Sequence, residues 1–275
     1  MSDTVWHAHG LGNDYLVWEG EAPLTSAQVM VLCDRQRGVG ADGVLEPRES
    51  SEADYGVRIW NPDGSVAEKS GNGLRIFAVW LSRYRGAGVS FTVHTGTDQV
   101  TCWLHEEGVR VEMGRATSEP SKIPVVEATH ERALVLGDHT VKVTAVGVGN
   151  PHAVVFVEED LDQIPWRVWG RALERHPDFP NRTNVQVARV LDGNRVEMRI
   201  WERGAGETSA SGSSACAVVA AAVWTGRIDR GRVRVQMPGG SLVVTLTPED
   251  RLILDGPVEE IGRVTLSGSL HRAGD

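Results

Sequence analysis

The amino-acid sequence contains one pattern twice, in two copies about 141 residues apart. The tripeptide RIW occurs at residues 58–60 and again at 199–201, and ten residues after each tryptophan comes a Ser-Gly pair that precedes a long apolar run. Two further matches follow the same order at nearly the same offset: GN at 12–13 and 149–150, and the alternating apolar stretches that begin at Val93 and Val235. Four ordered matches predict a duplicated unit, which restricts the chain to folds with two similar halves.

Each half shows the same mixture of short strands and two helices. Strands are expected where apolar and polar residues alternate between Gly, Asp and Asn turns, in the first half at 4–6, 15–19, 56–60, 90–94 and 109–113. A first helix is expected to begin after Ser26, as its N-cap, and to run to about Arg35. A second helix, after Asn72, is apolar on nearly every face, which favours a position enclosed by strands. Counterparts are expected at 166–175 and 213–224.

These patterns predict an α+β fold of two pseudo-symmetric lobes, each a curved, mostly antiparallel sheet wrapped around a central buried helix. We expect an N-terminal lobe over residues 1–118 and a C-terminal lobe over 119–262. The hinge is expected at 119–124, where Pro120 and Pro124 bracket a polar stretch. A last strand, at about 263–275, is expected to return to the N-terminal lobe.

Composition excludes several classes of protein. Of the 275 residues, 41% are hydrophobic and 24% are charged, which excludes disordered, collagen-like and coiled-coil chains. The formal net charge of −9 and the lack of a strongly basic segment argue against a nucleic-acid partner. The longest wholly apolar run, 215–224, is too short to span a membrane.

The cysteines and the N-terminus indicate the compartment. Cys33, Cys102 and Cys216 are few and lack CxxC spacing, which argues against a disulfide framework and against a zinc site. The first residues show no signal-peptide pattern, so a cytoplasmic location is expected.

The paired serines are the first candidate site. Ser70 and Ser211 each stand at the expected start of a buried helix, where unpaired N–H groups and a partial positive charge suit a carboxylate. The small turns that follow, Gly71-Asn72-Gly73 and Gly212-Ser213-Ser214, let backbone N–H groups approach an anion closely. The alternative is that each serine only caps its helix. If the halves are related by a pseudo-two-fold axis, the two serines should face each other across a cleft between the lobes.

A second group of candidates lies in a loop and beside turns. In the loop 202–208, ERGAGET, Arg203 can grip a ligand carboxylate with its planar fork, or else pair with Glu207 at the surface. The other candidates are four asparagines beside turns or strand ends and one histidine: Asn13, Asn61, Asn150, Asn184 and His152. Such asparagines are usually turn formers, but together they also suit recognition of an amino acid's ammonium and carboxylate groups. A lone histidine is more often structural, although His152 could tune a nearby acid or base.

Taken together, these motifs resemble the diaminopimelate epimerase family. The stretches that carry the resemblance span almost the whole chain in family order: HGLGNDY (9–15), DRQRGVGADGVL (34–45), NPDGSVAEKSGNGLR (61–75), GNPHAVV (149–155), FPNRTNV (179–185) and ERGAGETSASGSSACA (202–217).

The resemblance implies racemisation without metal or pyridoxal phosphate, at a cleft where one cysteine from each lobe flanks the substrate's α-carbon. One thiolate removes the α-proton and the opposite thiol delivers another to the other face. Helix N-termini lower the pKa of such thiols and stabilise the enolate-like charge. The resemblance also implies a small amino-acid substrate. The expected ligands are LL- and meso-diaminopimelate, the precursors of lysine and peptidoglycan. A homodimer is a further possibility, without a nucleic acid or membrane partner.

This chain departs from the family at both cysteine positions, which are occupied by Ser70 and Ser211. A serine hydroxyl is far less acidic than a thiol and needs a separate base. Three accounts remain open: an engineered double Cys→Ser variant, a natural relative that binds an amino acid or does different chemistry, and a slow epimerase helped by His152 or Glu202. A smaller departure is Gly43, where the resemblance implies a polar side chain that reaches the substrate in some members.

The expected site therefore has three parts. Ser70 and Ser211 hold the acid/base positions, and His152 and Glu202 tune their pKa values. The α-carboxylate is held at the helix N-termini, and the distal head of the amino acid is read by the asparagines and the ERGAGET loop. The substrate-binding residues are expected to be Asn13, Asn61, Gly71, Asn72, Asn150, Asn184, Glu202, Arg203, Gly212 and Ser213.

Overall fold

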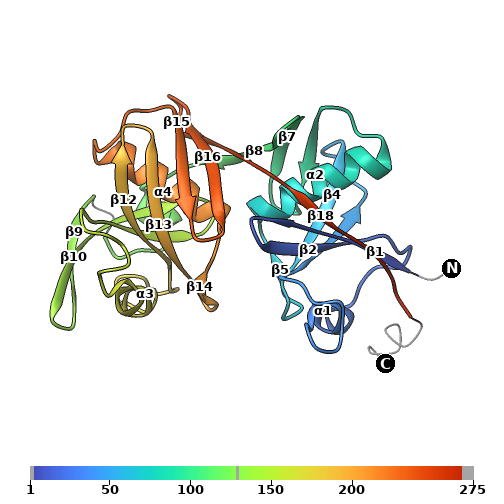
Figure 1. Cartoon of the computed structure of the whole chain (residues 1–275), viewed down its shortest axis with the longest axis horizontal. Helices are drawn as coiled ribbons and strands as arrows, with labels where there is room; N and C mark the ends of the chain where they lie inside the picture. Colours follow the sequence, from blue (N-terminus) through green and yellow to red (C-terminus); the bar gives the residue numbers. More distant parts are fainter. Residues whose placement is uncertain (1–2, 128–129, 268–275) are drawn as a thin grey trace. The chain divides into compact units, whose positions relative to one another are not determined.

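The computed structural model describes residues 3–127 and 130–267, which form two compact units (Figure 1). Unit 1 consists of Met1–Val111 and Gly256–Asp275, and unit 2 of Glu112–Asp255. Both crossings between units lie seven residues before the boundaries expected from the sequence, 118/119 and 262/263. The segment 119–124, expected to be a hinge, contains the 3₁₀ turn Pro120–Lys122 and belongs to unit 2.

Unit 1 is a sheet in the order β18-β1-β2-β3-β4-β6-β7-β8, with the short β5 paired to β4. The pairs β2–β3 and β4–β6 are parallel and the others antiparallel. Its strands are β1 (Thr4–Gly10), β2 (Asn13–Trp18), β3 (Val44–Arg48), β4 (Tyr55–Trp60), β5 (Val66–Ala67), β6 (Ser90–His94), β7 (Gln99–His105), β8 (Gly108–Arg115) and β18 (Glu259–Thr265).

Unit 2 repeats this topology strand for strand, in the order β9-β10-β11-β12-β13-β15-β16-β17, with β14 paired to β13. The parallel pairs are again the third and fifth in the order, β11–β12 and β13–β15. This identity of order and direction confirms the duplication. The strands are β9 (Arg132–Leu136), β10 (His139–Gly147), β11 (Pro151–Phe156), β12 (Asn184–Asp192), β13 (Arg195–Glu202), β14 (Gly206–Thr208), β15 (Arg232–Met237), β16 (Gly240–Leu246) and β17 (Arg251–Gly256).

Each unit has a central helix enclosed by its sheet, as predicted. In unit 1, α2 (Gly71–Arg85) packs against β1, β2 and β7, and its buried residues include Leu74, Ile76 and Phe77. In unit 2, α4 (Gly212–Trp224) packs against β10, β11, β12, β15 and β16, and is buried without a break from Ser214 to Ala222. A helix that is apolar on all sides has no solvent-facing stripe, so the sheet has to surround it. Both helices begin one or two residues earlier than expected.

A second helix in each unit lies outside this centre: α1 (Ser26–Cys33) and α3 (Trp166–Glu174). The expected N-cap Ser26 was wrong by one residue, because Thr25 and Gln28 form a reciprocal capping box. The helix also ends at Cys33 instead of Arg35. Asp34 leaves the helical conformation, and its side chain accepts hydrogen bonds from the backbone N–H groups of the next turn.

The last strand returns to unit 1, where β18 pairs antiparallel with β1 from Thr4↔Thr265 to His9↔Glu259. It begins four residues earlier than expected, and residues 268–275 of the expected strand lie outside the described residues. No helix within 3–127 or 130–267 combines the length and apolarity needed to cross a bilayer.

Candidate active site

Ser70 is the N-cap of α2, and its hydroxyl is held from two sides. Its Oγ accepts hydrogen bonds from the backbone N–H of Gly73 (3.0 Å) and from the hydroxyl of Tyr15 on β2 (3.0 Å). The capping role therefore exists, and it coexists with a second donor that capping does not require. Gly71 begins the helix and is buried, which leaves the first N–H groups of the helix beside Ser70.

Two of the predicted asparagines in unit 1 form one hydrogen-bonded chain with charged ends. Arg75 donates to Asn72 Oδ1 (2.6 Å), Asn72 donates to Asn13 Oδ1 (2.9 Å), and Asn13 donates to Asp42 Oδ2 (2.7 Å). Arg75 is fully buried and also donates to the carbonyl of Gly71. Because the guanidinium only donates and the carboxylate only accepts, the chain fixes which end of each amide faces which way.

A charged network on unit 1 supports the Asp42 end of this chain. Arg35 bridges Asp14 and Asp42 at 2.6 and 2.7 Å, and His7 bonds Asp14 at 2.7 Å. Burial alone would raise the pKa of Asp14, but the hydrogen bonds from His7 and Arg35 hold that pKa well below its ordinary value. Asn61, by contrast, bonds Ser65 within its own turn, so its described contacts are those of a turn former.

Ser211 occupies the equivalent position in unit 2, as the N-cap of α4 with an extended backbone. Unlike Ser70, its side chain makes no capping hydrogen bond. Gly212 and Ser213 follow it as the first residues of the helix, and Ser214 accepts a hydrogen bond from Gln186 on β12 (2.9 Å). The two helix starts are therefore alike in backbone and different in side-chain contacts.

His152 and two asparagines lie together in unit 2, because β11 and β12 run parallel and place His152 opposite Asn184. His152 Nε2 is 2.7 Å from Asn150 Oδ1, so the ring donates there. Burial lowers the pKa of His152 to about 3; the side chain of Gln186 opposes this shift, and the charge of Arg203 adds to it. The imidazole is therefore neutral at pH 7 and orients the amide of Asn150.

The ERGAGET loop is the turn between β13 and β14. Gly204 and Gly206 both have φ of +83°, which only glycine adopts without strain, and this explains the two glycines in a charged segment. Asn184 Oδ1 accepts from the backbone N–H of Arg203 (2.9 Å). Asn184 also donates to the carbonyl of Pro151, so it links β11, β12 and the loop.

The side chains of this loop point to different partners than the sequence suggested. Glu207 forms a bidentate ion pair with Arg167 of α3 at 2.7 and 2.8 Å, so the pairing of Arg203 with Glu207 considered above was wrong. Arg203 is exposed and its Nη1 donates to the carbonyl of Asn181 at 3.3 Å. Its guanidinium therefore lacks a carboxylate partner among the described hydrogen bonds and ion pairs of unit 2.

Glu174, which the sequence reading missed, holds this loop in place. Glu174 is 4% exposed, and its carboxylate accepts from the indole N–H of Trp201 (2.9 Å) and the backbone N–H of Gly204 (3.0 Å). Arg182 lies 3.6 Å away. Burial would raise the pKa of Glu174, but these donors lower it below its ordinary value.

The other residues missed from the sequence are Tyr15, Asp42, Arg75 and Gln186. Tyr15, Asp42 and Gln186 act through partners 28 to 55 residues away in the sequence, and Arg75 acts through the first turn of its own buried helix. One signal was present in the sequence, because Arg75 is a charged residue within an apolar helix that was expected to be enclosed.

The three cysteines are all buried and lie where the sequence placed them: Cys33 in α1, Cys102 in β7 and Cys216 in α4. The pKa of both Cys33 and Cys102 is raised to about 12, by burial in Cys102 and by burial together with the nearby carboxylates of Asp14 and Asp42 in Cys33. At neutral pH neither supplies a thiolate.

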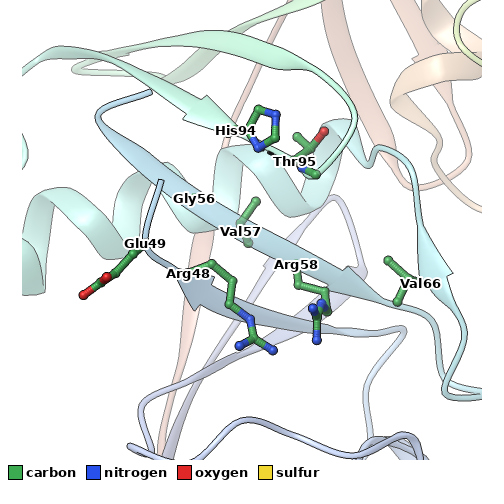
Figure 2. Close-up of a pocket in the computed structure, with 9 residues that line it drawn as sticks. Arg48, Glu49, Gly56, Val57, Arg58, Val66, His94 and Thr95 are labelled. Carbon is green, nitrogen blue, oxygen red and sulfur yellow. Dashed lines mark hydrogen bonds between the residues drawn. The ribbon is translucent and has the colours of Figure 1, made fainter. Parts of the chain in front are cut away.

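Unit 1 also contains an open pocket of about 420 Å³, and residues other than the predicted site residues line it. Figure 2 shows Arg48 and Arg58 extending to the same side of strand β4, with His94 on the other. Both guanidinium groups are anchored on the buried carboxylate of Glu46, at 2.8 and 3.8 Å, which also accepts from Trp60. Both positive charges are therefore paired with a carboxylate of the fold itself. None of the predicted site residues lines this pocket.

Comparisons with known proteins decide the family. The diaminopimelate epimerase model matches residues 5–119 and 144–261. The diaminopimelate epimerase of Synechococcus elongatus is 41% identical over 277 residues, covering 96% of this chain and 97% of that protein. The chain belongs to the diaminopimelate epimerase family. This agrees with the resemblance seen in the sequence motifs.

Solved structures show the same fold beyond this family. A probable proline racemase from Agrobacterium radiobacter superimposes with a TM-score of 0.72 at 16% identity, covering 97% of this chain and 93% of that one. A hydroxyproline epimerase from Agrobacterium vitis gives a TM-score of 0.70 at 16% identity, covering 96% and 93%. The expected α+β fold with two similar lobes is therefore confirmed for a member of the diaminopimelate epimerase family.

Proposed function

We propose that this protein is a cofactor-independent amino-acid epimerase whose ligands are LL- and meso-diaminopimelate, and that serine at both acid/base positions makes its turnover very slow. Ser70 and Ser211 are the proposed groups, acting on opposite faces of the α-carbon. The observation that carries this proposal is that the two serines occupy the N-cap positions of the equivalent helices in two topologically identical units. The name shared by relatives at about 40% identity supports the choice of ligand.

The starts of α2 and α4 are proposed to bind the α-carboxylate through Gly71, Asn72, Gly212 and Ser213. A helix N-terminus stabilises negative charge, and here that charge grows as the α-proton leaves. The distal ammonium and carboxylate of the ligand are proposed to contact the remaining predicted residues: Asn13, Asn61, Asn150, Asn184, Glu202 and Arg203.

The acidity of the two hydroxyls limits the rate. A thiol with an ordinary pKa of about 8.5 reaches the thiolate form near neutral pH, whereas an alkyl hydroxyl does not. His152 offers no general base to compensate, because its pKa of about 3 makes the ring a very weak base, and the ring is fully buried and donates to Asn150. The alternative, an amino-acid-binding relative that has left catalysis, shares the same recognition groups.

The test compares the chain with the Ser70→Cys/Ser211→Cys variant. Calorimetry measures binding of diaminopimelate, and NMR in deuterated buffer follows the α-proton and the LL-to-meso ratio. We expect both proteins to bind and the double variant to exchange and invert at least 10²-fold faster, since positioned proton transfer is worth about 10²–10⁴-fold. A double variant that binds the ligand but stays inert would establish the binding protein instead.

The geometry has its own test, a crystal structure with diaminopimelate bound. Ser70 and Ser211 are expected on opposite sides of the ligand's α-carbon, and side chains in separate cavities would refute the two-face mechanism. The homodimer and the cytoplasmic location expected from the sequence stay predictions.

A further inference from the structure

Ser70 and Ser211 differ in the side chains that contact their hydroxyl groups. The GN match at 12–13 and 149–150 makes Tyr15 the counterpart of His152, since each follows its GN pair by two residues on the equivalent strands β2 and β11. His152 turns to Asn150, whereas Tyr15 donates its hydroxyl proton to Ser70 Oγ at 3.0 Å. The duplication therefore places a phenol against one serine only.

The tyrosine ring is fixed in this position by its surroundings. Tyr15 is 7% exposed. A Cβ at Gly43 would lie 2.5 Å from its Cε1 and 2.4 Å from the carbonyl oxygen of Trp60. The tyrosine ring therefore packs directly against residue 43. Any side chain there would collide with the ring, so only glycine leaves room for it. This close packing holds the hydroxyl at Ser70 without rotational freedom.

The hydrogen bonds on Ser70 also fix the direction of its own proton. Its Oγ accepts from both Tyr15 and the backbone N–H of Gly73, so its O–H has to point away from these two donors. A hydroxyl that accepts two hydrogen bonds keeps its own proton for a third partner, so it can give that proton to a ligand atom and receive another from the phenol. A phenol has an ordinary pKa of about 10, well below that of an alkyl hydroxyl, so it is a better proton source for the serine.

We infer that Tyr15 is the proton relay of Ser70, and that this side of the site can deliver a proton to the ligand while the Ser211 side cannot. The inference rests on the proposed function. In the Ser211→Cys variant the thiolate at residue 211 takes the α-proton, and the C–H electron pair stays on the ligand as an enolate-like anion. The Ser70 O–H bond then breaks as its proton bonds to Cα, and the Tyr15 proton moves to Ser70 Oγ. The phenolate recovers a proton from water, and the base releases the one it took.

The inference predicts that the two single restorations differ. Ser211→Cys gains a thiol base and keeps the Tyr15–Ser70 pair, so it is expected to invert diaminopimelate. Ser70→Cys leaves Ser211, whose hydroxyl receives no such hydrogen bond from the residues that the structure describes, so this variant is expected to exchange the α-proton with deuterium without inversion. NMR in deuterated buffer distinguishes exchange from inversion in both variants.

Tyr15→Phe then removes one oxygen and keeps the ring over Gly43. In the Ser211→Cys background we expect it to lower the inversion rate about 10²–10⁴-fold with calorimetric affinity unchanged. In the Ser70→Cys/Ser211→Cys background we expect less than about a tenfold loss, because a thiol exchanges its proton with water unaided. Tyr55→Phe on β4, the same deletion elsewhere in unit 1, is the matched control and is expected to change neither rate.

Three results would overturn the inference. Equal loss in both backgrounds would make Tyr15 a structural residue, and equal behaviour of the two single restorations would remove the asymmetry. An inert Ser211→Cys beside an active double variant would refute the relay and leave the proposed function intact. A double variant that binds but stays inert would instead overturn both.

Discussion

Replacing Glu174 with glutamine tests whether a buried carboxylate holds the ERGAGET loop. The two oxygens of Glu174 accept separately from the indole N–H of Trp201 and the backbone N–H of Gly204. A glutamine offers one carbonyl oxygen, so its NH₂ group has to face one of the two donors. A buried donor left without an acceptor costs about 1–3 kcal/mol. We therefore expect Glu174→Gln to lower the free energy of unfolding by about that amount.

The matched control is Glu207→Gln in the same unit. Glu207 makes two hydrogen bonds to Arg167, but its side chain is 44% exposed and that of Arg167 is 62% exposed. Water can replace those bonds, so we expect a loss below about 1 kcal/mol. Urea unfolding followed by tryptophan fluorescence measures both variants, and amide hydrogen exchange at Gly204 reports the loop itself. Equal losses, or unchanged protection at Gly204, would refute the role given to Glu174.

Two further predictions concern acid stability and ligand binding. Below a pH of about 6.5 the unfolded chain protonates His152, whereas the native ring stays neutral down to its pKa of about 3, so stability is lost as pH falls through that window. His152→Gln should therefore reduce the stability difference between pH 7 and pH 5 by about 2 kcal/mol, measured as urea midpoints, and an unchanged difference would contradict the burial of a neutral ring. Arg203→Lys should weaken binding of diaminopimelate by about 1–3 kcal/mol in calorimetry, whereas unchanged affinity would leave Arg203 a structural role.

The sequence predicted correctly those parts of the fold that depend on residues close together in the chain. Ser70 and Ser211 occupy the N-cap positions of their helices, and the apolar runs after them are enclosed by strands, because a helix start and an all-round apolar helix are encoded within a few residues. The start of α1 was missed although its signal was present. Thr25 and Gln28 are three residues apart, the spacing of a capping box, whereas Ser26 has Val29 at that position.

The supporting contacts of the candidate site could not be read in the same way. Tyr15 meets Ser70 across 55 residues, and Asn13 meets Asn72 across 59, because parallel and antiparallel strands bring them together around α2. Such pairs have no fixed spacing in the sequence. The position of each is set by strand register, which depends on packing throughout the unit.

The return of β18 to β1 sets the order in which the protein can be completed during synthesis. Unit 2 is continuous from Glu112 to Asp255, whereas the pairing Thr4↔Thr265 joins residues at almost opposite ends of the chain. A ribosome that has made all of unit 2 still holds a unit 1 whose first strand has one unpaired edge. That edge stays open for addition of another strand until residue 265 has emerged, so the nascent chain is exposed to mispairing at β1 throughout the synthesis of unit 2.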